Sequence, residues 1–199
     1  MSLFTPYITH YLLLDAARML SDMDTAQEMN TDFVSLYKGG PEQHLSSVAP
    51  YLFACNNHEK FENWIAENVG KSWGIFVTCN ADMEDMCYHF RKFLKVKTED
   101  LQQLYFRFYD PRVLRIFLPT CDRKQIVEFF GPVQAFICEQ DEEGHFKRYT
   151  HNKGELIIEE IAKKKIIKEL NIEPQKIITP IETTPETTNT TNTKGRKWL

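Results

Sequence analysis

Two hydrophobic patterns alternate along most of the chain. Short apolar runs, typical of buried strands, are followed by segments whose apolar residues recur every three to four positions, as on one face of a helix. We expect strands at five such runs, over residues 10–14, 33–37, 51–55, 73–79 and 133–138. This alternation predicts an α/β fold built on a mixed sheet, in which the last hairpin is antiparallel.

The stretch over residues 105–114 is the clearest example of this pattern. Its first half reads as a strand over residues 104–109, with Arg107 among its residues. Asp110 then stands where its carboxylate can accept hydrogen bonds from the first N–H groups of a helix, and Pro111 follows where a missing N–H costs nothing. The same order of strand, capping residue and helix recurs at Asp15, Asn56 and Asn80.

Beyond residue 150 the composition changes. Residues 155–170 are rich in strong helix formers, and we interpret them as one kinked helix or two short ones within a helical extension over residues 151–172. A helix with two apolar faces could dock on the domain and still offer one face to a partner. The candidate contact residues are Leu156, Ile157, Ile161, Ile166 and Ile167. Residues 173–199 are rich in Thr, Asn and Pro, and we expect a disordered tail.

The charge balance narrows the classes of partner. The 199 residues carry a formal net charge of -4, whereas a nucleic-acid binder normally shows a basic face. The case for nucleic acid rests on the lysines at 163–165 and on the basic residues 194–199. No run approaches the roughly 20 apolar residues of a membrane span, and the first residues lack a signal-peptide pattern. We therefore expect a cytoplasmic protein that contacts neither nucleic acid nor the membrane interior.

Motifs that carry chemistry are missing from the sequence. It has no glycine-rich phosphate loop, no Gly-x-Ser-x-Gly turn and no His or Cys spacing typical of a metal site. Its five cysteines are widely scattered, which fits reduced, mostly buried thiols rather than a disulfide framework. We predict no catalytic residue, no metal and no cofactor.

Asp15, Arg107, Asp110 and Arg112 form the strongest polar constellation. Both acids are expected at strand ends, where ligands of α/β sheets gather. An internal ion-pair network explains them, because each acid also caps a helix, and a small enzyme with its site at Asp15, Arg107 and Asp110 is the alternative. Since a buried, unpaired arginine is costly, we predict that Arg107 pairs with Asp15 or Asp110.

Residues 106–114, Phe-Arg-Phe-Tyr-Asp-Pro-Arg-Val-Leu, resemble the signature of the effector adaptors, or effector chaperones, of the bacterial type VI secretion system. These adaptors are called the Tap/TEC family and have long been classed as a domain of unknown function. Other blocks agree with the family in order, at residues 11–17, 49–52, 73–75, 89–91 and 130–132. The resemblance covers roughly residues 8 to 140.

The resemblance implies an adaptor-like α/β domain over residues 1–150, with an N-terminal lobe to about residue 110 and a C-terminal lobe over residues 111–150. It implies a cytosolic protein, not itself an enzyme, that binds the N-terminal segment of a type VI effector and loads it onto the VgrG spike. Arg107, Asp110 and Arg112 carry over from the family only as signature positions.

Overall fold

The computed structural model describes residues 8–40, 42–55, 58–97, 100–140 and 144–169, with side chains as far as residue 166. The strands of this part are β1 (Thr9–Asp15), β2 (Phe33–Ser35), β3 (Pro50–Ala54), β4 (Gly74–Cys79), β5 (Lys95–Lys97), β6 (Gln103–Tyr105), β7 (Val133–Glu139), β8 (His145–Asn152) and β9 (Glu155–Ala162). The helices are α1 (Ala16–Met19), α2 (Asp22–Met29), α3 (Glu59–Asn68), α4 (Met83–Arg91), α5 (Pro111–Phe117), α6 (Arg123–Phe130) and α7 (Lys163–Glu169), with short 3-10 turns η1 (Ser46–Val48) and η2 (Leu118–Thr120).

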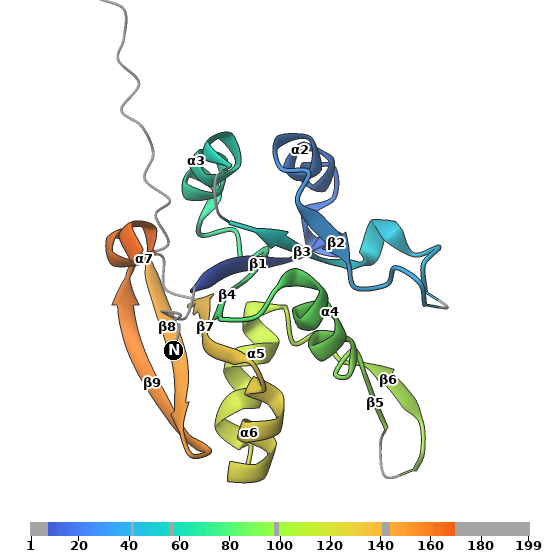
Figure 1. The fold of residues 1–199 in the computed structure, drawn as a ribbon, viewed down its shortest axis with the longest axis vertical. Helices are drawn as coiled ribbons and strands as arrows, with labels where there is room; N and C mark the ends of the chain where they lie inside the picture. The colour runs from blue at the N-terminus through green and yellow to red at the C-terminus, as the bar shows by residue number, and fades with distance from the viewer. Residues whose placement is uncertain (1–7, 41, 56–57, 98–99, 141–143, 170–199) are drawn as a thin grey trace, which may run out of the picture.

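One seven-stranded sheet organises the molecule, in the order β2-β3-β1-β4-β7-β8-β9 (Figure 1). The remaining strands, β5 and β6, form a separate hairpin that projects from the body. These findings confirm the α/β class. Every strand pair within the described residues is antiparallel, including the pairing of β4 with β7. The expected lobe boundary near residue 110 stays a prediction, and the sheet contains strands from both sides of it.

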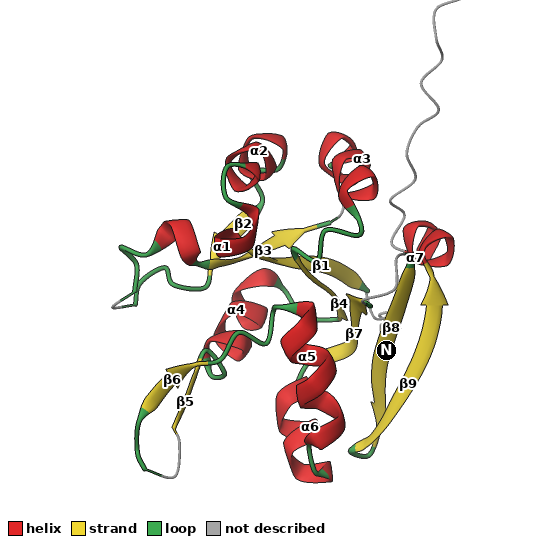
Figure 2. Cartoon of the chain, turned by 180° about the vertical axis from the view of Figure 1, so that it is seen from behind, coloured by secondary structure: helices red, strands yellow, loops and turns green. Residues whose placement is uncertain are grey.

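Helices cover both faces of the sheet (Figure 2). Each face also has its own aromatic cluster. On the face of α2 and α3, rings stack in sequence from strand to helix: Phe53, Phe61, Trp64 and Trp73. On the face of α4, α5 and α6, the rings in contact are Phe90, Phe108, Phe129 and Phe136. Burial of large aromatic side chains on both faces explains why the central strands read as continuous apolar runs.

The predicted helix starts at Asp15 and Asp110 are confirmed. Asp15 accepts a hydrogen bond from the backbone N–H of Ala17, and Asp110 accepts one from that of Arg112. Asp122 and Gln125 form a capping box at the start of α6. The cap expected at Asn80 is wrong, because the side chain of Asp82 holds the first turn of α4, and Asn56 lies outside the described residues.

The strand predicted over residues 104–109 ends earlier than expected. β6 stops at Tyr105, and the N–H of Phe106 then donates to the carbonyl of Leu94 at 2.9 Å. From there the chain leaves the hairpin and turns into the core, where Phe108 is fully buried. Arg107 therefore lies in the connection between β6 and α5 rather than inside a strand.

The helix predicted over residues 155–170 is wrong in its first half, so the extension over residues 151–172 is not helical throughout. Glu155–Ala162 is the strand β9, and a helix, α7, begins only at Lys163. The cause is a two-residue hairpin turn at Lys153 and Gly154, both with positive φ (49° and 83°), which pairs the segment with β8. The predicted tail over residues 173–199 lies outside the described residues.

Candidate functional site

Asp15 and Arg107 form an ion pair where β1 meets α1. The side chain of Asp15 is 0% exposed and that of Arg107 is 41% exposed. One carboxylate oxygen, Oδ1, accepts the N–H of Ala17 at 3.1 Å, and the other, Oδ2, accepts Nη2 of Arg107. The predicted partner of Arg107 is thus confirmed, and both carboxylate oxygens of Asp15 have a donor.

The surroundings of Asp15 change its titration. Burial raises its pKa above the ordinary value, and the nearby charge of Asp110 adds to this, while Arg107 and the N–H of Ala17 act in the opposite direction. Beside this pair the hydroxyls of Tyr37 and Tyr109 share a hydrogen bond, and burial raises the pKa of both phenols. The cluster therefore contains a carboxyl and two phenols whose charged forms are disfavoured.

Asp110 and Arg112 form the second ion pair of the constellation, at the start of α5. Nε of Arg112 donates to Oδ1 of Asp110 at 3.0 Å, and Nη2 of Arg112 donates to Oδ2 at 2.6 Å, so the ion pair is bidentate. Burial alone would raise the pKa of Asp110, but the hydrogen bonds and charge of Arg112 hold it below the ordinary value. The two acids are linked through the backbone, because the N–H of Asp110 donates to the carbonyl of Arg107 at 3.0 Å.

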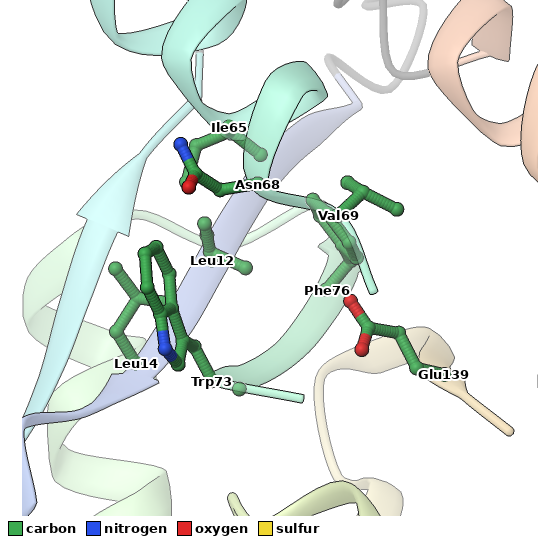
Figure 3. Close-up of a pocket in the computed structure, with 9 residues that line it drawn as sticks. Leu12, Leu14, Ile65, Asn68, Val69, Trp73, Phe76 and Glu139 are labelled. Carbon is green, nitrogen blue, oxygen red and sulfur yellow. The ribbon is translucent and has the colours of Figure 1, made fainter. Parts of the chain in front are cut away.

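A small cavity lies on the opposite side of β1, between the sheet and α3 (Figure 3). Its volume is about 20 Å³, which is room for water and not for a substrate. The carboxylate of Glu139 at its rim is already occupied, since it accepts the N–H groups of Gly70 at 2.8 Å and Ser72 at 2.6 Å. We call this contact the Glu139 clamp, and it holds the loop that follows α3.

More open hollows lie on the surface of the described part of the chain. The α5 groove is almost wholly apolar and is lined by Asp110, Arg112, Val113, Ile116, Phe117 and Thr120. The α4 groove, about 550 Å³, is lined by Val34, Lys38, Met83, Glu84, Cys87, Tyr88 and Arg91. The η1 groove, about 280 Å³, is lined by Phe33, Val34, Ser35, Lys38, Gln43, Ser46 and Tyr51. The α4 and η1 grooves share Val34 and Lys38, so they adjoin each other at β2.

The residues predicted to contact a partner do not gather on one surface. Ile161 and Ile166 are buried, Leu156 is half-buried and Ile157 is 49% exposed. The side chain of Ile167 lies outside the described part of the structure. Strand alternation in β9 places Leu156 on one face and Ile157 and Ile161 on the other, and Ile166 lies in α7.

Little in the amino-acid pattern indicates the grooves beside β2. Residues 30–43 are polar and contain two glycines, but ordinary surface loops share this composition. The grooves arise because α4 and η1, which are distant in sequence, lie against the same strand. A short apolar run next to the turn residues Gly39 and Gly40 was the one available signal of an edge strand.

Neither a membrane span nor a metal cluster is found within the described ranges. Within them, no helix combines the length and the apolar character needed to cross a bilayer. In the same ranges, no group of three or more His, Cys, Asp and Glu side chains could hold a metal ion. All five cysteines lie in this part of the chain as free thiols, and burial raises their pKa values.

The family described as "Domain of unknown function (DUF4123)" matches residues 10–128, which is more than half of the chain. No curated protein and no solved structure gives a significant match. The matched segment includes Asp15, Arg107, Asp110 and Arg112 together with β2, and it ends before β7.

Proposed function

The chain belongs to the DUF4123 family, and on this premise we propose that it is a non-enzymatic adaptor of a type VI secretion system. In this proposal it binds the N-terminal segment of an effector in the cytoplasm and loads it onto the VgrG spike. The family match supports the shared domain, and the likeness of residues 106–114 to the adaptor signature supports the role.

The observation that carries this proposal is that structural contacts occupy the polar cluster. Asp15 holds the first turn of α1 and Arg107, and Asp110 does the same for α5 and Arg112. A catalytic carboxylate needs an oxygen that a substrate can reach, and the side chain of Asp15 is 0% exposed. The cluster therefore holds β1, α1 and the start of α5 together, and we call it the brace around Asp15. Binding of a partner is then assigned to the surface grooves.

A small enzyme centred on Asp15, Arg107 and Asp110 is the second candidate. It is favoured by the raised pKa of Asp15, because acids with perturbed pKa values gather at active sites. The variant Asp15→Asn separates the two proposals, since it removes the charge and keeps an amide that can cap α1. An adaptor with this substitution keeps its partner, whereas an enzyme loses its reaction.

The surface features fit a protein that captures peptides. The α5 groove exposes Ile116, which is 74% accessible, and the grooves beside β2 combine apolar walls with charged rims. Peptide-binding proteins use such surfaces in two ways, by seating an amphipathic helix or by adding a strand to a sheet edge. Effector segments with exposed apolar residues would need this cover until delivery.

Co-purification tests the proposed function. The tagged full-length chain is expressed with the spike protein and the candidate effector encoded beside it, and the complex is isolated by size-exclusion chromatography. We expect a defined complex that contains the effector, and an effector that becomes insoluble when the chain is omitted. A matched control uses the same effector without its N-terminal segment, which should not be retained. If the chain elutes alone while every neighbouring protein stays soluble without it, the adaptor proposal fails.

A further inference from the structure

The strand β2 forms one free edge of the seven-stranded sheet. Within the described residues it pairs only with β3, and its register sets Val34 opposite Leu52. Two hydrogen bonds flank this pairing: the N–H of Leu36 donates to the carbonyl of Pro50, and the N–H of Ala54 donates to the carbonyl of Asp32. The even-numbered residues of this segment therefore direct their backbone groups towards β3. In an antiparallel pair the alternate residues turn their backbone groups outward. The N–H and C=O of Phe33 and the N–H of Ser35 therefore point away from the sheet.

Two grooves adjoin this edge. Phe33 and Ser35 line the η1 groove and not the α4 groove. Val34 lines both, and in the α4 groove it lies together with Met83 and Cys87. An added strand would point its successive side chains to the two faces in turn. With two grooves beside one edge strand, one groove can receive the odd-numbered side chains of the added strand and the other the even-numbered ones.

The opposite edge of the sheet, β9, is built differently. Three of its eight residues are acidic, and two of these form ion pairs: Glu155 with Arg123, and Glu159 with Arg148 and Lys165. Charged side chains along an edge strand are a common protection against unwanted strand pairing. β2 lacks acidic and basic residues in its own three positions, Phe33–Ser35.

The charge around β2 indicates what kind of segment would bind there. Lys38 lies on the rim of both grooves, and Arg91 and Glu84 lie on the rim of the α4 groove. Arg91 is held in place by hydrogen bonds to the carbonyls of Leu36 at 2.9 Å and Ser35 at 3.2 Å, which are uncharged acceptors. Two cations face one anion in a chain whose net charge is -4. The rim therefore favours an apolar segment that carries acidic side chains.

We propose that the N-terminal segment of the effector binds by adding an extended, apolar and acidic stretch as a strand along β2. This inference rests on the proposed function and names the surface and the chemistry of its partner. A second copy of the chain is a poorer occupant, because edge-to-edge pairing would bring Lys38 of one copy towards the same cationic rim of the other. The outward groups of Phe33 and Ser35 supply the main-chain hydrogen bonds, and the grooves supply selectivity.

Two pairs of variants test the edge. Ser35→Pro removes the outward N–H without removing a ladder bond, and Ser35→Ala is its control because it also loses the hydroxyl that accepts the N–H of Tyr37. Lys38→Glu reverses the charge shared by both grooves, and Lys124→Glu makes the same change on the exposed surface of α6. Circular dichroism melts establish that each full-length variant is folded. The probe is the effector's N-terminal segment, titrated by biolayer interferometry.

We expect Ser35→Pro and Lys38→Glu to weaken binding at least tenfold, and the two controls to change it less than twofold. Residue-resolved hydrogen exchange gives an independent readout. On binding, the amides of Phe33 and Ser35 should become protected, whereas that of Val34, already in the ladder, should not change. This alternation is specific to strand addition, since a partner held by side chains alone would not produce it.

The outcomes separate this inference from the proposed function. If the wild-type chain binds the effector and each variant behaves like its control, docking on β2 is wrong and the adaptor function stands. If Ser35→Pro and Lys38→Glu lose the spike protein but keep the effector, or abolish a dimer of the chain alone, the assigned occupant is wrong. If the wild-type chain binds no neighbouring protein, the proposed function fails and this inference fails with it.

Discussion

Replacing Arg107 with alanine would leave the buried carboxylate of Asp15 without its cationic partner. Removing one member of a buried ion pair costs roughly 3–5 kcal/mol, because the remaining charge stays away from water. Here the side chain of Arg107 is 41% exposed, so water can enter the space that it leaves. We therefore expect the lower end of this range, a loss of about 3 kcal/mol in the free energy of unfolding at pH 7. For a chain of this size, that corresponds to a fall of roughly 6–12 °C in Tm.

The pH dependence of this loss follows from the raised pKa of Asp15. A carboxyl whose pKa is higher in the folded than in the unfolded state, where it is about 3.9, stabilises the fold below the unfolded value, and this contribution is lost as pH rises through the folded pKa. Without Arg107 the folded pKa of Asp15 rises further. The deficit of Arg107→Ala should therefore be smallest near pH 4 and should grow towards neutral pH.

Urea unfolding of four proteins checks the argument: wild type, Arg107→Ala, Asp15→Asn and the double variant. Asparagine keeps the cap of α1 and removes the charge, so Arg107→Ala should cost less than about 0.5 kcal/mol in that background. The same loss in both backgrounds, or a deficit that does not change between about pH 4 and pH 7, would refute the assignment of the pair as the source of stability.

Two further predictions concern Asp110 and Gly131. Asp110→Asn keeps the cap of α5 but loses the charge paired with Arg112. Because the pKa of Asp110 is lowered in the folded state, this carboxylate stabilises the fold above about pH 4, its unfolded pKa. That contribution to stability is lost as the pH falls through the folded pKa. Urea titrations should thus give a cost of about 1 kcal/mol at pH 7, and this cost should shrink steadily as the pH falls below about 4. Gly131→Ala should lower stability by about 3 kcal/mol in the same assay, because φ is +50° and a Cβ would lie 2.3 Å from Cε1 of His89. Gly144→Ala, with φ +82° and no atom within 4 Å of the new Cβ, is the control and should cost about 1 kcal/mol, and equal losses would contradict the clash with His89.

The brace around Asp15 could be predicted because its parts are local. A polar residue after an apolar run caps the next helix, and this rule identifies both Asp15 and Asp110 without any knowledge of the tertiary fold. That Arg107 is paired follows from a second general rule, because a buried charge must have a partner; the rule left Asp15 and Asp110 open, and the structure shows Asp15. The capping rule depends only on residues that are near in sequence. The pairing rule depends on the free-energy cost of burying an unpaired charge, which every fold must meet.

The C-terminal strand was missed because local propensity and tertiary pairing disagree there. Glu155–Ala162 consists of residues that also suit a helix, and the pairing with β8 decides the outcome. The turn at Lys153 and Gly154 was the available signal, since glycine accepts the positive φ that such a hairpin needs. The antiparallel order of the sheet and the grooves beside β2 depend on contacts between distant segments, so periodicity alone could not reveal them.

The Glu139 clamp has a consequence for the order of events during synthesis. Glu139 leaves the ribosome 67 to 69 residues after the loop that it holds, whose N–H groups at Gly70 and Ser72 it accepts. At about 5–20 residues per second, that interval lasts roughly 3–14 s. During it, β4 also lacks its neighbour β7. The segment that matches the family ends at residue 128, so a nascent chain stopped there is expected to require chaperone protection rather than to fold.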